Sequence, residues 1–332
     1  MIDIEKYKNS MYAARKRIQN VTVQTPLLYS KWLSKETGAN IYLKMECEQI
    51  TNSFKLRGAV NTIYKLHEET MEAKGNIEKI VTASSGNHGV ACAYAASKLN
   101  VPLSVYVYTS IPKAKEERLL EYSNVEIVKH GKECCEAEVY GRTCATRSGL
   151  LFISPYNNTD VICGQATIGL ELLDQLKSLD AVIVPVGGGG LISGIALAIK
   201  LHNPNIKVIG CQPKNDCCMF ESINAGKILD DNIMASTFSD GTAGRVEPGS
   251  VTFEICQNYV DDWVLVEEED IQRAVFDIMD KQKKIIEGAA GLAVAAARKN
   301  QAEFKNKNVA VIMCGANIGI ESIKYLVNKY SK

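Results

Sequence analysis

Four consecutive glycines, Gly187 to Gly190, follow the apolar run Val182–Val186 and precede a helical stretch that begins at Leu191. The backbone N–H groups of such a loop can converge on one anion, and the N-terminus of the next helix adds partial positive charge. Close packing of a helix on a sheet usually needs one or two glycines rather than four. We therefore expect a phosphate-binding loop made of Gly187, Gly188, Gly189 and Gly190.

This phosphate is not expected to belong to a dinucleotide. The glycine run departs from the pattern G-x-G-x-x-G, because Gly194 comes one position late after Gly188 and Gly190. At the end of the next apolar run, Gln212 stands where that fingerprint requires Asp or Glu. The sequence therefore favours a smaller phosphate ligand.

A second polar segment, Ser84-Ser85-Gly86-Asn87-His88-Gly89, lies between the apolar run Ile80–Ala83 and a helical stretch that ends near Leu99. Serine and asparagine at the start of a helix are often simple N-caps. The same loop also offers several hydrogen-bond donors to a carboxylate. The loop by itself leaves both interpretations open.

Lys55 is a candidate nucleophile. Most lysines are solvated surface charges. Lys55, however, directly follows Phe54 and opens the apolar helical stretch Leu56–Ala59. Such surroundings can desolvate an amine and lower its pKa, which favours nucleophilic chemistry.

The elements that must position these residues alternate between apolar strands and amphipathic helices. Strands are predicted at Ile41–Leu43, Ile80–Thr82, Leu103–Tyr108, Val125–Val128, Ala181–Val184, Val208–Gly210 and Val309–Ile312. Helices are predicted at Ala91–Leu99, Lys115–Tyr122, Ile168–Leu179, Leu191–Leu201, Glu269–Asp280 and Ala289–Lys299. This alternation predicts an α/β fold whose parallel sheets are covered by helices on both faces. Ligands of such sheets bind at the carboxyl ends of the strands, where the polar loops above lie.

The composition is that of an ordinary globular protein. The chain has 332 residues, 38 basic and 38 acidic side chains, and 46% hydrophobic residues. A net charge of zero provides no field that would attract nucleic acid or anionic lipid, so neither is an expected partner. The uncharged run Ala181–Ile199 contains Pro185 and four glycines, which indicates strand, loop and helix rather than a membrane span.

The cysteines and the first residues indicate a reducing compartment. Eleven cysteines are scattered without a CxxC motif, and four histidines form no HxxxH pair, so neither disulfides nor a zinc site are expected. Charges at Glu5 and Lys6 interrupt the stretch in which a signal peptide would be apolar. We expect a cytoplasmic protein, and a redox function for the neighbouring pairs Cys134-Cys135 and Cys217-Cys218 stays open.

Together, the segments around Lys55, Ser84–Gly89 and Gly187–Gly190 resemble, in this order, the fold type II pyridoxal-phosphate enzymes. The branch is that of the serine/threonine dehydratases (threonine ammonia-lyases) and serine racemases, and the resemblance covers nearly the whole chain. It implies a tryptophan-synthase-β-like α/β fold with two open parallel-type sheets flanked by helices. It also implies a large domain of residues 1–52 and 153–332, a small inserted domain of residues 53–152, and no regulatory C-terminal domain.

The resemblance assigns the site residues as follows. Lys55 would be the Schiff-base lysine. Lys55 and Ser85, which would lie on opposite faces of the cofactor, would be the catalytic residues. Pyridoxal 5'-phosphate is expected to contact Phe54, Lys55, Asn87, Gly187, Gly188, Gly189, Gly190, Gly241, Glu287 and Cys314. Asn87 would meet the cofactor's 3-hydroxyl, and Cys314 would lie beside its pyridine nitrogen. The substrate carboxylate is expected on Ser84, Ser85, Gly86, Asn87 and His88.

No metal site is expected. Gln212 and Cys218 stand where the metal-dependent serine racemases carry acidic ligands, and the nearby Asp180 and Asp216 alone make a poor magnesium or calcium cage. This departure favours a catabolic-type dehydratase.

The activity implied is elimination of water from L-threonine or L-serine, which gives a 2-oxo acid and ammonia. The alternatives are a serine racemase, a dehydratase of another 3-hydroxy amino acid, and, in a different class, a non-catalytic binding protein that kept the fold. A homodimer or homotetramer is expected from the family.

Overall fold

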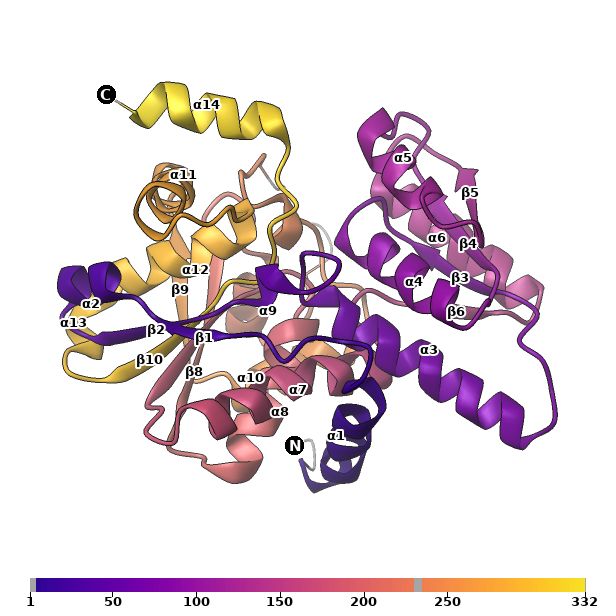
Figure 1. Ribbon diagram of the computed structural model, residues 1–332, viewed down its shortest axis with the longest axis horizontal. Helices are drawn as coiled ribbons and strands as arrows, with labels where there is room; N and C mark the ends of the chain where they lie inside the picture. The colour runs from indigo at the N-terminus through magenta and orange to yellow at the C-terminus, as the bar shows by residue number, and fades with distance from the viewer. Residues whose placement is uncertain (1–3, 230–234, 332) are drawn as a thin grey trace.

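The computed structural model describes residues 4–229 and 235–331. Two lobes lie side by side, each built on its own sheet (Figure 1). We call them the six-stranded lobe and the four-stranded lobe. Helix α3 (Lys55–Glu72) runs from one lobe towards the other and packs on helices of both.

The six-stranded sheet has the strand order β1-β2-β10-β7-β8-β9. All neighbours in it are parallel except β1 and β2. The strands are β1 (Leu27–Tyr29), β2 (Asn40–Lys44), β7 (Ala181–Pro185), β8 (Lys207–Pro213), β9 (Asp262–Val266) and β10 (Asn308–Ile312). The central strand β7 is buried along its whole length, as expected for a strand with helices on both faces.

The four-stranded sheet is entirely parallel and has the order β5-β4-β3-β6. Its strands are β3 (Ile80–Ala83), β4 (Leu103–Val107), β5 (Val125–Lys129) and β6 (Leu151–Ile153). The two open sheets confirm the predicted α/β fold class, and each predicted strand is present. Strands β1, β6 and β9 were not predicted.

Helices surround both sheets (Figure 1). Those near the six-stranded sheet are α1 (Glu5–Ile18), α2 (Lys31–Thr37), α7 (Thr159–Gln175), α8 (Gly190–His202), α9 (Cys218–Ala225), α10 (Val251–Tyr259), α11 (Glu268–Asp277), α12 (Gly288–Lys299), α13 (Gln301–Phe304) and α14 (Ile320–Tyr330). The four-stranded lobe carries α4 (Asn87–Lys98), α5 (Lys113–Leu120) and α6 (Cys134–Arg147). Short helical turns occupy Glu46–Glu48, Asp240–Thr242 and Ile278–Gln282.

The helix predicted at Ile168–Leu179 is misplaced. In the structure, α7 begins after Asn158, whose side chain accepts hydrogen bonds from the N–H groups of Asp160 and Val161. This N-cap starts the helix nine residues before the predicted position. The helix ends at Gln175, so the apolar residues beyond it pack outside the helix.

Helices α3 and α7 cross at unusually close range. A Cβ added to Gly164 would come within 2.6 Å of the carbonyl oxygen of Arg57 and of the Cα of Gly58. A Cβ added to Gly58 would come within 2.9 Å of Val161. The two glycines therefore let the first turns of α3 rest directly on the backbone of α7.

Beside this crossing lies a buried network of four charges. Arg57 Nε binds Glu46 at 2.7 Å, Arg57 Nη1 binds Glu171 at 2.6 Å, and Lys44 Nζ binds Glu171 at 2.5 Å. Lys44 also donates to the carbonyl of Thr25. The charges of the two cations and the two carboxylates sum to zero. Their ion pairs connect the start of α3 with β2 and α7.

Candidate active site

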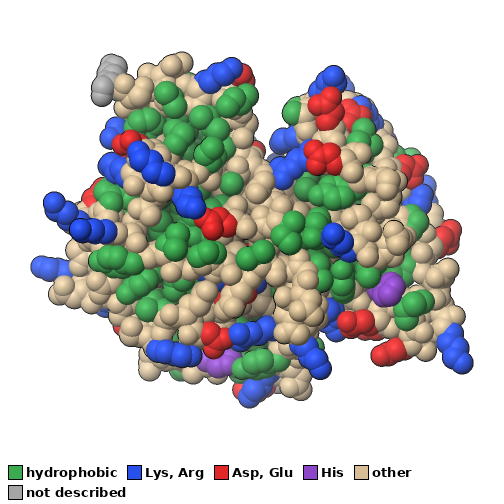
Figure 2. Space-filling model, in the orientation of Figure 1, with side chains coloured by type: hydrophobic (Ala, Val, Ile, Leu, Met, Phe, Trp, Pro, Cys, Tyr) green, Lys and Arg blue, Asp and Glu red, His purple; other side chains and the backbone are tan. Residues whose placement is uncertain are grey.

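A cleft of about 1490 Å³ lies between the two lobes, and the surface is visibly hollowed there (Figure 2). The residues predicted from sequence to form the site all line it: Phe54, Lys55, Ser84, Ser85, Gly86, Asn87, His88, Gly187, Gly188, Gly189, Gly190, Gly241, Glu287 and Cys314. The fold brings them together because strands β3, β7 and β10 all lead into the cleft at their carboxyl ends.

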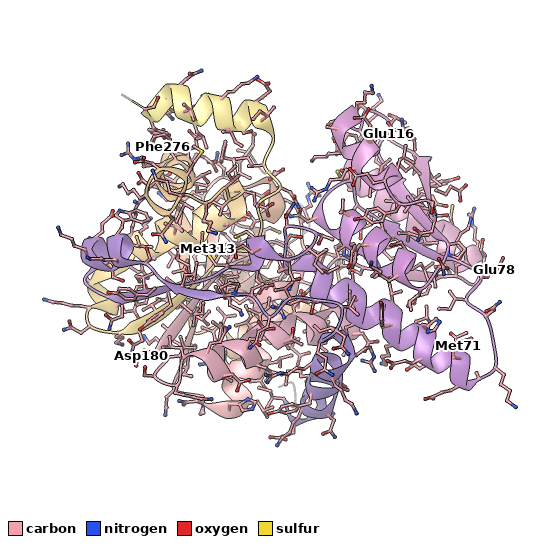
Figure 3. All side chains as sticks on the ribbon, viewed as in Figure 1. Met71, Glu78, Glu116, Asp180, Phe276 and Met313 are labelled. Carbon is pink, nitrogen blue, oxygen red and sulfur yellow. The ribbon has the colours of Figure 1, made fainter. Side chains whose placement is uncertain are left out.

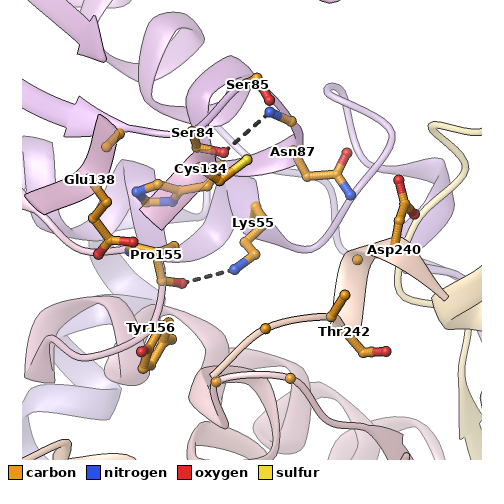
Figure 4. Close-up of a pocket in the computed structure, with 18 of the residues that line it drawn as sticks. Lys55, Ser84, Ser85, Asn87, Cys134, Glu138, Pro155, Tyr156, Asp240 and Thr242 are labelled. Atoms are coloured by element: carbon orange, nitrogen blue, oxygen red, sulfur yellow. Dashed lines mark hydrogen bonds between the residues drawn. The ribbon is translucent and has the colours of Figure 1, made fainter. Parts of the chain in front are cut away.

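Lys55 opens α3 and extends into the cleft (Figure 4). Its Nζ donates a hydrogen bond of 2.9 Å to the carbonyl of Pro155 and lies 5.2 Å from the centre of the Phe54 ring. Burial lowers the pKa of Lys55 to about 8. An amine with this pKa is partly neutral near neutral pH and can act as a nucleophile.

The loop Ser84–His88 forms another part of the cleft wall and leads into α4. Ser84 Oγ accepts a hydrogen bond of 3.2 Å from the N–H of Gly86. No side chain among the described residues caps α4, so the loop presents the free N–H groups of a helix N-terminus to the cleft. This arrangement can bind a carboxylate.

The ring of His88 has an internal role. Its Nε2 donates to the carbonyl of Ile153 at 3.2 Å, and Cys92 Sγ lies 3.5 Å from the same nitrogen. Burial, followed by the charge of Lys55, lowers the pKa of His88 to about 3, so the ring is neutral. His88 lines the cleft, but Nε2 of its ring is already hydrogen-bonded to the backbone of β6 at Ile153.

Asn87, Glu287 and Asn317 form a hydrogen-bonded cluster across the cleft. Asn87 Nδ2 donates to both carboxylate oxygens of Glu287 at 3.0 and 3.1 Å, and Asn317 Nδ2 donates to Asn87 Oδ1. The backbone N–H of Asn317 also donates to Glu287 at 3.1 Å. Burial raises the pKa of Glu287 to about 7 despite these donors. Cys314 Sγ lies 4.0 Å from Glu287, and burial raises the pKa of this thiol, so it stays protonated.

The glycine loop leads from β7 into α8. Gly189 has a φ of +86°, which few other residues adopt, and no described side chain caps the helix. The free N–H groups at the start of α8 therefore face the cleft and can bind a phosphate.

Neighbouring segments also leave little room for a side chain at any of these four glycines. An added Cβ would meet Thr242 at 3.0 Å from Gly187, the Tyr156 ring at 2.5 Å from Gly188, Met219 at 2.9 Å from Gly189, and the backbone of Tyr156 at 2.9 Å from Gly190. Packing and anion binding are both compatible with the loop.

Several cleft residues were not singled out from the sequence. Glu138 and Arg142 on α6, Tyr156 after β6, and Glu247 all line the cleft. Glu247 N–H donates to the Tyr156 hydroxyl at 3.0 Å. The only sequence signal for Tyr156 is its place three residues after a strand, and β6 is too short to be recognised.

Of the positions considered for a metal, Gln212, Asp216 and Cys218 lie in one region and Asp180 lies apart from them. Gln212 Oε1 accepts from the N–H of Phe220 at 2.8 Å, and Cys218 Sγ contacts the carbonyl of Leu229. Asp180 does not lie near Asp216, contrary to the sequence interpretation: it precedes β7, at the end of the sheet away from the cleft (Figure 3), whereas Asp216 lines the cleft. Within residues 4–229 and 235–331, no three His, Cys, Asp or Glu side chains are grouped to hold a metal ion.

Comparison with known protein families identifies the chain. The family described as "Pyridoxal-phosphate dependent enzyme" matches residues 18–315. The chain belongs to this family. The resemblance found in the sequence motifs is thereby confirmed, and the cofactor of the family is pyridoxal phosphate.

Members of the pyridoxal-phosphate family with related sequences and structures fall in the expected branch. L-threonine ammonia-lyase of Thermotoga maritima is 38% identical over 99% of this chain and 79% of the relative. The processed form of threonine deaminase isoform 2 from Solanum lycopersicum has a TM-score of 0.90 and 33% identity, over 99% of this chain and 88% of that structure. Maize serine racemase has a TM-score of 0.87 and 30% identity, over 97% of each chain.

The cleft fits the family's cofactor. Pyridoxal phosphate requires a nucleophilic amine for its aldehyde and a site for its phosphate. The desolvated amine of Lys55 and the uncapped start of α8 supply both. Among the described helices, none has the length and apolar character needed to cross a bilayer.

Proposed function

We propose that this pyridoxal-phosphate enzyme is an ammonia-lyase that removes water from L-threonine or L-serine and releases a 2-oxo acid and ammonia. The observation that carries the proposal is the convergence, in one cleft, of the desolvated Lys55 amine, the carboxylate-binding start of α4 and the phosphate-binding start of α8. The relatives named threonine ammonia-lyase and threonine deaminase support the same reaction.

In this proposal, the residues have separate tasks. Lys55 would bind the cofactor covalently and, once displaced by the substrate amine, would remove the Cα proton. The loop Ser84–His88 would hold the substrate carboxylate, with Asn87 shared between substrate and cofactor. The glycine loop Gly187–Gly190 would bind the phosphate, and Phe54, Gly241 and Glu287 would line the cofactor.

The bound cofactor would serve as an electron sink for the electrons left at Cα. Cys314 is proposed to lie beside the pyridine nitrogen. Because its thiol stays protonated, it contributes no negative charge there, unlike a carboxylate. Prompt loss of the β-hydroxyl would then be favoured, and hydrolysis would yield pyruvate from serine or 2-oxobutyrate from threonine.

We also propose the organisation of the protein. Residues 1–52 and 153–332 would form the large domain, and residues 53–152 the small inserted one. Homodimers or homotetramers in the cytoplasm are proposed from the family, and light scattering of the purified protein would measure the oligomeric state.

Proton NMR of the holoprotein in heavy water, with L-serine and L-threonine supplied separately, tests the reaction. Pyruvate or 2-oxobutyrate should accumulate with little D-isomer. The Lys55→Ala protein should lose both turnover and the visible absorption of lysine-bound cofactor. Full turnover in that variant would refute the proposal.

Racemisation of serine is the second candidate, because maize serine racemase shares the fold at 30% identity. Ser85 would then deliver a proton to the face of Cα opposite Lys55. D-serine appearing faster than pyruvate in the same experiment would favour this activity.

A further inference from the structure

The α6 wall of the cleft carries a carboxylate that the proposed reaction does not use. Glu138 lies on the second turn of α6 and lines the same cleft as Lys55. Its side chain is 27% exposed. Burial lowers the pKa of Lys55, and the charge of Glu138 is one of those that oppose this shift; Figure 4 draws both side chains in the cleft. The carboxylate is therefore close to the reactive amine.

Arg142 holds this carboxylate in place. Its Nε and Nη2 donate to Glu138 Oε1 at 3.1 and 2.7 Å. The same Nη2 pairs with Glu247 Oε2 at 2.8 Å, and the guanidinium lies 4.4 Å from the centre of the Phe152 ring. One cation thus faces two carboxylates, and these three side chains together carry a net charge of −1.

The second oxygen of Glu138 has no such partner. The contacts with Arg142 use only Oε1, and no donor from the described part of the chain reaches Oε2. A fixed, partly exposed oxygen with a free lone pair is suited to accept a hydrogen bond from a ligand in the cleft.

The position of a bound amino acid follows from the proposed function, on which this inference rests. With its amine at Lys55 and its carboxylate on the loop Ser84–His88, the substrate has two of its three groups fixed. Its side chain must then point to the remaining walls, and α6 is the wall that carries Glu138 next to Lys55.

We infer that Glu138 sets the substrate class of this site. It accepts a hydrogen bond from side chains that end in a donor, such as the hydroxyl of serine or threonine. It repels side chains that end in a carboxylate, because two carboxylates would meet in a partly desolvated cleft. Amino acids with a dicarboxylic skeleton, such as L-threo-3-hydroxyaspartate, are thereby poor substrates.

The test compares elimination from L-serine and from L-threo-3-hydroxyaspartate by the holoenzyme. Both lose water between Cα and Cβ, and hydrolysis gives ammonia with pyruvate or oxaloacetate, respectively. The Glu138→Gln variant removes the charge but keeps an oxygen for Arg142. The control, Glu121→Gln, removes one exposed negative charge from the same lobe outside the cleft.

In Glu138→Gln, the ratio of kcat/KM for hydroxyaspartate to kcat/KM for serine should rise about tenfold, mostly through a lower KM for hydroxyaspartate. Glu121→Gln should leave the ratio unchanged. A ratio in Glu138→Gln equal to that of the control would overturn the inference. Unaltered visible absorption of the variant verifies that it folds and binds the cofactor.

Failure of the proposed function is distinguishable from failure of the inference. If the wild-type protein eliminates water from neither serine nor threonine, the proposed function is wrong. Spectral titration of the holoenzyme with the two amino acids then still measures their affinities. A Glu138→Gln variant that binds hydroxyaspartate no better than the wild type would also refute the assignment of Glu138.

Discussion

Replacing Arg57 by Leu is expected to destabilise the protein strongly. The Arg57 side chain is 1% exposed, and it binds both Glu46 and Glu171. In the wild-type network, Lys44 and Arg57 balance the two carboxylates. Without Arg57, one negative charge remains uncompensated in a volume that water does not reach.

The expected cost follows from this imbalance. Removing one partner of a buried ion pair typically costs about 3–5 kcal/mol, because the charge left behind is desolvated. A matched control is Arg15→Leu. Arg15 on α1 binds Asp174, which lies on α7 like Glu171, but the Arg15 side chain is 40% exposed. Exposed pairs of this kind contribute about 0–1 kcal/mol.

Urea unfolding followed by circular dichroism, with the same cofactor saturation for all proteins, measures both changes in the free energy of unfolding.

The pH dependence of the stability loss is a second test. Burial would raise the pKa of Glu46, but the Arg57 guanidinium outweighs burial and holds it below its usual value. In Arg57→Leu, Glu46 should therefore take up a proton more easily, and the loss of stability should shrink as the pH falls from about 7 to about 5. Equal losses for the two Arg variants, or a pH-independent loss, would refute the reasoning.

Three further predictions concern the cleft and the helix crossing. The pKa of Lys55 is lowered to about 8 by burial, and the neutral amine is the nucleophile, so the apoprotein should bind pyridoxal phosphate faster as the pH rises through about 8. Stopped-flow absorbance measures this rate, and a constant rate from about pH 7 to about pH 10 would contradict the assignment. The pKa of Glu287 is raised by burial from 4.5 to about 7, so the folded apoprotein holds a proton that the unfolded chain releases between these values. Its contribution to stability should fall by about 3 kcal/mol as the pH rises through this range, and Glu287→Gln should abolish that slope in urea unfolding. Gly164→Ala should cost about 1–3 kcal/mol because its Cβ would meet the Arg57 carbonyl oxygen at 2.6 Å, whereas Gly319→Ala, which has no described atom within 4 Å, should change the unfolding free energy by less than about 0.5 kcal/mol.

Much of the fold was predictable because the buried strands are continuous apolar runs. Strand β7, for example, is buried at all five positions. Strands β1 and β6 span only three residues each, which is too short for a pattern to stand out, and β9 is a partly exposed edge strand. Helix α7 was misplaced because its start depends on the Asn158 cap, and Gly164 and Gly169 weaken the helical pattern.

The motifs located the candidate site through its loops, which lie at strand ends. Glu138 and Arg142 could not be predicted in the same way. They lie in the interior of a helix, where a charged pair four residues apart usually means a solvated surface. Only the three-dimensional structure shows that this pair lines the same cleft as the glycine loop.

The glycine contact between α3 and α7 has a consequence for how this enzyme can change. It joins the amine of Lys55 to the six-stranded lobe, whereas Glu138 and the loop Ser84–His88 belong to the four-stranded lobe. The amine of Lys55 and the proposed specificity residue Glu138 are thus held by different packing contacts, although both lie within the proposed small domain of residues 53–152. With Glu138 in its proposed role, mutations in α6 would alter which amino acid is accepted while the contacts that hold the lysine stay intact, so new specificities could evolve, or be engineered, around the same lysine.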